Sequence, residues 1–123
     1  MKIRIFETGR GWRIPRRRIA ALARRLLRSE PTAFKEINLI IADDRYLRDL
    51  NRRYFKKDRP TNVIAFDLGQ MAEVYLSRDQ VLNPDELLYV VAHGLLHLAG
   101  YDHRSTRDQA RMDRRCRKYS SHG

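Results

Sequence analysis

One long apolar segment, residues 87–98, is the feature that most limits how this chain can fold. A helix that is apolar on nearly every side has no solvated face, so it must be buried. Asn83 is a good N-cap, Pro84 suits the first helical position, and Glu86 can complete a capping box. Gly100 then ends the helix. The sequence therefore predicts a central buried helix around which the other elements are arranged.

Two histidines interrupt this apolar segment. His93 and His97 are four residues apart, so their side chains lie on one helical face, one turn apart. Gly100 permits a left-handed backbone that turns the chain back, and His103 can then join them. Three imidazoles leave the fourth position of a tetrahedral zinc ion open for water, as in catalytic rather than structural zinc sites. The spacing predicts one Zn²⁺ ion held by His93, His97 and His103.

The alternative is that these are ordinary histidines, each with its own protein partner. The chain has four histidines, and three of them fall within residues 93–103, whereas His122 lies in the tail. An unpaired ring in apolar surroundings costs about 1–3 kcal/mol, and a metal provides a partner for all three rings at once. Asp102 has two interpretations: it orients a ligand imidazole from behind, or it is a turn residue after Gly100.

The rest of the chain predicts the fold class. Alternating or continuous apolar runs predict four short strands, at residues 3–6, 37–42, 63–66 and 72–76. Helical apolar spacing predicts three more helices, beginning near Pro15, at Asp43 or Asp44, and at Ser105. This order predicts a single α+β domain over residues 1–123, in which a small four-stranded mixed sheet packs with four to five helices around the central one.

Positive charge is concentrated in three regions of the chain. Lys and Arg total 26 against 15 acidic residues, which gives a net charge of +11. Residues 10–29 carry eight Arg and no acid, and residues 45–59 and 104–118 each carry seven basic residues against two acidic ones. Such a field attracts a polyanion such as a nucleic acid. The alternative is a solvated surface in an organism that uses much arginine.

Several observations argue against a membrane or an oxidising compartment. No apolar run approaches the ~20 residues needed to cross a bilayer, and the N-terminus lacks the pattern of a signal peptide. The basic segments lack the exposed Trp and Phe of an interfacial helix. Cys116 is the one cysteine, so no internal disulfide can form. We expect a cytoplasmic protein with no membrane partner.

The histidine spacing also occurs in metzincin proteases, which offers a test of the chemistry. Those enzymes place a glutamate directly after the first histidine as the general base. Here that position is Gly94, so peptide hydrolysis is disfavoured. In a basic protein, a metal-bound water is better suited to a phosphodiester bond.

Two motifs resemble those of the YbeY family of rRNA maturation endoribonucleases. Residues 93–103 read HGLLHLAGYDH, like the family signature, and residues 58–64 read DRPTNVI, like its second motif. The resemblance covers nearly the whole chain. It implies a metal-dependent, single-strand-specific endoribonuclease that acts in 16S rRNA 3′-end maturation and ribosome quality control, with His93, His97 and His103 as the zinc ligands. The implied partners are single-stranded RNA, rRNA in the 30S subunit, and ribosomal proteins or an assembly GTPase.

The chain departs from the family pattern before the second motif. Many members have an arginine there that is important for activity, and Phe55 takes its place here. The candidate catalytic residues are His97, Arg59 and Arg53, and the candidate RNA contacts are Arg53, Lys56, Lys57, Arg59 and Asn62. The departure leaves two alternatives open: a non-catalytic, zinc-braced ribosome or RNA-binding factor, and a metal-dependent hydrolase of another substrate. Trp12 and Tyr101 can stack a base, or they belong to the core or its rim.

Overall fold

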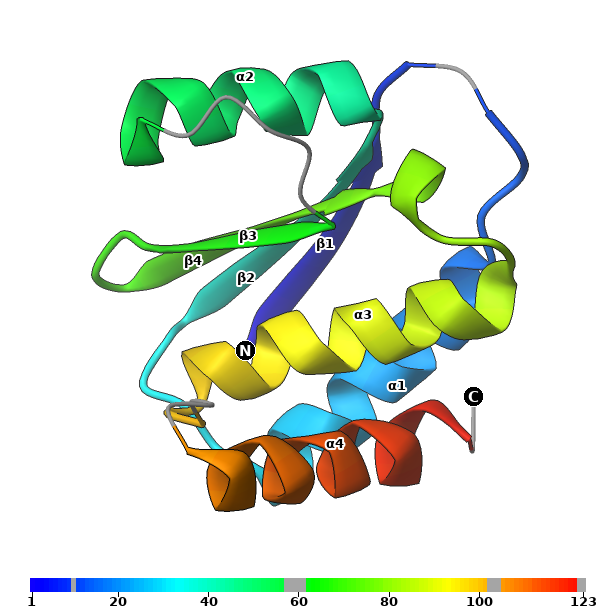
Figure 1. The fold of residues 1–123 in the computed structure, drawn as a ribbon. Coiled ribbons are helices and arrows are strands. Elements are labelled where there is room, and N and C mark those ends of the chain that lie inside the picture. The colour runs from blue at the N-terminus through cyan, green and yellow to red at the C-terminus, as the bar shows by residue number, and fades with distance from the viewer. Residues whose placement is uncertain (10, 57–61, 102–104, 122–123) are drawn as a thin grey trace.

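The computed structural model describes residues 1–9, 11–56, 62–101 and 105–121 (Figure 1). The strands are β1 (Lys2–Glu7), β2 (Glu36–Ala42), β3 (Val63–Asp67) and β4 (Met71–Ser77). The α-helices are α1 (Arg16–Ser29), α2 (Asp44–Phe55), α3 (Pro84–Leu98) and α4 (Thr106–Ser120), and a short 3₁₀ helix, η1 (Arg78–Gln80), follows β4. The element order and the α+β class predicted from the sequence are confirmed. No helix in the described part of the chain is both long and apolar enough to span a membrane.

The four strands form one mixed sheet in the order β1-β2-β4-β3. β2 runs parallel to both β1 and β4, and β3 pairs antiparallel with β4 at the edge. In the central strand β2, every residue after Glu36 is buried. A strand buried on both faces reads as a continuous apolar run, which explains why residues 37–42 lack alternation.

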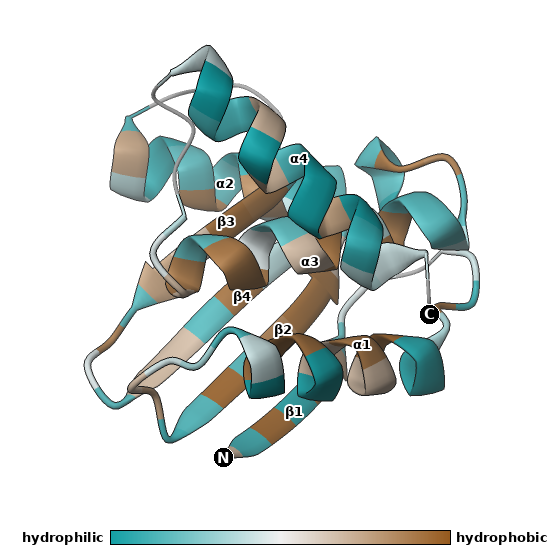
Figure 2. Ribbon diagram, turned by 90° about the horizontal axis from the view of Figure 1, so that it is seen from below, coloured by the Kyte–Doolittle hydropathy of each residue, from teal (hydrophilic) through white to brown (hydrophobic). Residues whose placement is uncertain are grey.

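Helices cover the two faces of the sheet unequally. In Figure 1, α1, α3 and α4 lie below the sheet and α2 lies above it. Apolar residues of all four strands pack with α1 and α3 in the main core, and α4 is mostly hydrophilic along its length (Figure 2). The face toward α2 buries only a small second cluster of Ala42, Leu47 and Ile64.

Helix α3 is the buried central helix that the sequence predicts. Eight of its residues are buried, including Gly94. A Cβ atom at Gly94 would lie 2.7 Å from Val74 Cγ1 and 3.0 Å from Val63 Cγ2. A methyl group would therefore push the helix away from the sheet. Gly94, which stands where a metzincin protease has its glutamate, is thus a residue at which α3 contacts β3 and β4.

The helix caps are close to the predicted ones. The Asn83 side chain accepts a hydrogen bond from Glu86 N at 2.9 Å. The Glu86 carboxylate reaches back one residue further than a capping box requires, to Leu82 N at 3.0 Å. Of the two aspartates proposed to cap α2, Asp43 does so, accepting from Tyr46 N at 2.9 Å. These bonds satisfy N–H groups that have no partner within a helix.

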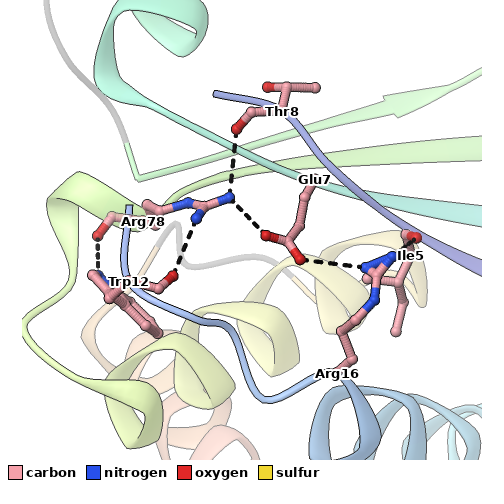
Figure 3. Close-up of polar contacts among 6 residues, drawn as sticks. All are labelled: Ile5, Glu7, Thr8, Trp12, Arg16 and Arg78. Carbon is pink, nitrogen blue, oxygen red and sulfur yellow. Dashed lines mark hydrogen bonds and ion pairs between the residues drawn. The ribbon is translucent and has the colours of Figure 1, made fainter. Parts of the chain in front are cut away.

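A buried arginine ties the segment between β1 and α1 to the end of β4 (Figure 3). Arg78 is 3% exposed, and its guanidinium donates to Trp12 O at 3.1 Å and to the Glu7 carboxylate at 3.2 Å. It also donates to Thr8 O, and Trp12 Nε1 donates back to Arg78 O at 3.3 Å. Glu7 further pairs with Arg16. Such pairing offsets the cost of burying a charge.

Candidate metal centre

His93 and His97 lie side by side on α3, as their spacing predicts. Their ring centroids are 4.9 Å apart and the ring planes meet at 67°. Both side chains are partly exposed, at the boundary of the apolar helix. The described residues contain no group of three His, Cys, Asp or Glu side chains placed to hold a metal. His103, the expected third ligand, lies outside them, as does Asp102, so convergence of all three rings stays a prediction.

The end of α3 turns the chain back, as the glycine predicts. Gly100 has a φ of 103°, in the region that L-residues rarely adopt. Its N–H donates to His97 O at 3.1 Å, and Tyr101 N donates to Leu96 O at 3.0 Å, which is the Schellman pattern. The Tyr101 hydroxyl then donates to Glu30 at 3.0 Å. The chain is therefore anchored to the end of α1 two residues before His103.

Helix α4 returns antiparallel along the histidine face of α3. The Tyr89 hydroxyl donates to the Asp113 carboxylate, and one turn further along His93 lines a pocket with Gln109. By the helical repeat, this register predicts that His97 lies opposite the N-terminus of α4, which begins at Thr106. The N-cap of α4 is Ser105, whose side chain accepts from Asp108 N at 3.1 Å.

A pocket of about 240 Å³ opens beside His93, lined by Tyr89, His93, Gln109, Met112 and Asp113. Burial and the hydrogen bond to Asp113 raise the pKa of Tyr89, which keeps its hydroxyl protonated as a donor. No pattern in the sequence predicted this pocket. Its signal was available in part, because Tyr89, His93 and His97 follow one another at four-residue intervals on one helical face.

The candidate cationic residues fall in different parts of the fold. Arg53 is exposed on α2, on the sheet face opposite to α3, and pairs with Asp49 at 3.2 Å. Lys56 caps the C-terminus of α2 with a φ of 55°. Arg59 and Lys57 lie outside the described residues. The structure thus does not bring Arg53 to the histidines, and its catalytic role stays a prediction.

Asn62 lies closer to the histidine helix. It is exposed directly before β3, and its backbone carbonyl accepts from Ser77 N at 3.0 Å. The next residue, Val63, is one of the two valines that approach Gly94. Asn62 is therefore held at the edge of the sheet near α3, and its contact to RNA stays a prediction.

The two aromatic residues singled out for base stacking are engaged within the protein. Trp12 packs against the main core and its ring N–H bonds to Arg78 O. Tyr101 packs against the same core, and the Arg111 guanidinium lies 5.5 Å from its ring centroid. Cys116 is fully buried, as expected of a small core residue, and burial raises the pKa of its thiol to about 12.

These features define a class: small α+β proteins with a histidine pair on the central helix and a glycine turn after it. A family model described as Endoribonuclease YbeY matches residues 7–122. The chain belongs to this family of endoribonucleases, hydrolases that act on RNA, and the resemblance inferred from the two motifs is confirmed.

Individual relatives support the same assignment. The chain is 34% identical over 96 residues to Endoribonuclease YbeY of Neorickettsia sennetsu, covering 65% of this chain and 67% of the relative. It is 32% identical over 131 residues to that of Geobacter metallireducens, covering 90% and 87%. The solution structure of TM1509 from Thermotoga maritima matches with a TM-score of 0.63 at 28% identity, over 97% of this chain and 87% of that one.

Proposed function

We propose that this chain is a zinc-dependent endoribonuclease specific for single strands, with one Zn²⁺ per chain bound by His93, His97 and His103. The observation that carries the proposal is the pair of imidazoles with centroids 4.9 Å apart on a helix fixed against the sheet. Membership in the Endoribonuclease YbeY family supports RNA as the substrate.

The donor set suits zinc. Imidazole nitrogen is a preferred zinc ligand, and three such ligands leave room for a water. The register of α3 and α4 supports His103 as the third ligand. His93 lines a pocket with Gln109, one further helical turn leads to His97 and towards the N-terminus of α4, and His103 precedes the N-cap, Ser105, by two residues. The Schellman turn at Gly100 turns the chain back directly after α3.

The chain's own residues would bind and orient the RNA. A bound Zn²⁺ would supply a Lewis acid and a water of lowered pKa. The residue after His93 is Gly94, which has no carboxylate to act as a base and packs against the sheet. Arg59 is the candidate to stabilise negative charge on the phosphate, and Arg53, which lies on the other sheet face, would have to act on a more distant part of the RNA.

We propose rRNA of the 30S subunit as the substrate, with 16S 3′-end maturation and ribosome quality control in the cytoplasm as the role. The net charge of +11 supports a polyanionic partner. Ribosomal proteins or an assembly GTPase are the proposed protein partners.

The test compares His97→Ala with His122→Ala, which removes the histidine that the proposal does not use. We expect wild-type protein and the His122 variant to retain zinc and cleave single-stranded RNA, and His97→Ala to lose both. Cleavage by His97→Ala at the wild-type rate in the presence of chelator would contradict the proposal. Zinc binding with no cleavage by the wild-type protein would instead favour the non-catalytic RNA-binding factor.

A further inference from the structure

Five aromatic rings form a continuous patch on the α2 face of the sheet. The aromatic patch consists of Tyr46, Tyr54 and Phe55 on α2, Phe66 on β3 and Tyr75 on β4. Phe66 is at its centre: its ring centroid lies 5.3 Å from that of Tyr54, 6.0 Å from that of Phe55 and 5.8 Å from that of Tyr75. Tyr46 stacks on Tyr75 at 5.9 Å.

The rings that α2 contributes are largely exposed. Tyr54 is 64% exposed, Phe55 47% and Tyr46 42%. A helix usually turns such rings into the core, and a contiguous exposed set is typical of a binding surface. The small second cluster beneath α2 holds the rings in place while leaving those of Tyr54 and Phe55 open to solvent.

Positive charge predominates on α2, which carries three of the five rings. Residues 44–56 carry five basic side chains against Asp44 and Asp49. The basic side chains are Arg45, Arg48, Arg52, Arg53 and Lys56, all of them exposed. Asp49 pairs with Arg52 and Arg53 at the surface, where ion pairs contribute little and exchange readily. Exposed rings among cations are the combination with which proteins bind single-stranded nucleic acids without reading sequence.

Edge strand β3 connects the patch with the histidine helix. Val63 approaches Gly94 of α3, next to His93, and Phe66 follows three residues later on the other side of the strand. Three residues of strand span about 10 Å. One polynucleotide strand that passes the edge of the sheet can therefore reach both places.

We infer that Tyr54 and Phe55 form a base-stacking site for single-stranded RNA, which holds the strand beside the histidine centre. This inference rests on the proposed function for the identity of the ligand. A protein partner would also cover exposed rings, but RNA is favoured because residues 44–56, which carry both rings, have five basic side chains against two acidic ones. The acidic residues Asp67 and Glu73 lie on the strands and not on α2. Glu73, the acidic residue paired with Phe66 across the strands, accepts a hydrogen bond from Tyr75.

The test replaces both rings with leucine, in the Tyr54→Leu/Phe55→Leu variant, which keeps apolar area and charge but removes the aromatic faces. Binding of a labelled, short single-stranded oligoadenylate is measured by fluorescence anisotropy with chelator present, so that neither metal nor cleavage contributes. We expect binding weaker by about 5- to 150-fold, the range of base–aromatic stacking. Leu82→Ala is the matched control, because Leu82 is 89% exposed before α3, outside the patch.

A second ligand separates stacking from charge. An abasic strand of the same length keeps the phosphates, so wild type and double variant should bind it equally. Equal binding of oligoadenylate by the two proteins, with wild type binding it well, would overturn the inference and assign the patch to a protein partner. Failure of wild type to bind any RNA would instead count against the proposed function. Circular dichroism of the variant excludes loss of folding as the cause.

Discussion

The two faces of the sheet are covered in different ways. On one side, α3 contacts the strands at Gly94 and is enclosed by α1 and α4, which produces the large main core. On the other side, Leu47 and Asn51 are the only buried residues of α2, and its aromatic side chains are exposed to solvent. Dense packing restricts motion and fixes geometry, whereas a thin layer leaves surface for a ligand. The histidine pair lies on the first side and the proposed RNA-stacking rings on the second.

The largest expected difference is in the cost of losing core volume. Leu95→Ala in α3 should lower the free energy of unfolding by about 2–5 kcal/mol, because a cavity in a dense core collapses only in part. Leu50→Ala in α2 should cost less, since Leu50 is only partly buried beside the small cluster. Urea unfolding of both variants measures the difference. Equal losses would show that the two layers are equally dense.

A smaller effect should follow from adding a methyl group where α3 meets the sheet. Gly94→Ala places a Cβ 2.7 Å from Val74, whose β-branched side chain has little freedom to move. We expect a loss of about 1–3 kcal/mol from overpacking. Val74→Ala in the same chain should recover part of this loss. The double variant should therefore lose less free energy of unfolding than the two single variants lose together. Additive losses would mean that the contact at Gly94 does not limit the approach.

The smallest effect compares two half-buried tyrosine hydroxyls, one on each face of the sheet, at alkaline pH. Burial, together with the hydrogen bond to Glu73, raises the pKa of Tyr75 from 10.0 to about 12. Its contribution to stability is complete below pH 10 and is lost as pH rises to about 12, because the unfolded chain releases the proton first. Tyr75→Phe should therefore reduce the fall in stability over that interval.

Tyr89→Phe is the matched change on the α3 side. Burial raises the pKa of Tyr89 as well, and its hydroxyl donates to Asp113. Thermal unfolding at several pH values measures both variants. An unchanged alkaline slope in Tyr75→Phe would show that the α2 face leaves this hydroxyl as solvated as in the unfolded chain.

Local patterns in the sequence determined the secondary structure and half of the candidate site. The apolar run of α3, its Asn83 cap and the turn at Gly100 depend on residues within a few positions of each other. The pairing of His93 with His97 follows from the same helical repeat. Such features are readable without a fold because the interactions that produce them span about one helical turn.

Tertiary structure alone decided what meets across the chain. That Gly94 faces Val63 and Val74 depends on the strand order, which no local pattern encodes. The aromatic patch is assembled from three separate elements, and Arg78 donates a hydrogen bond to Glu7, which lies 71 residues away in the sequence. These contacts depend on how strands and helices pack at long range, so the rings of α2 became a candidate RNA-binding surface only when the sheet placed Phe66 and Tyr75 beneath them.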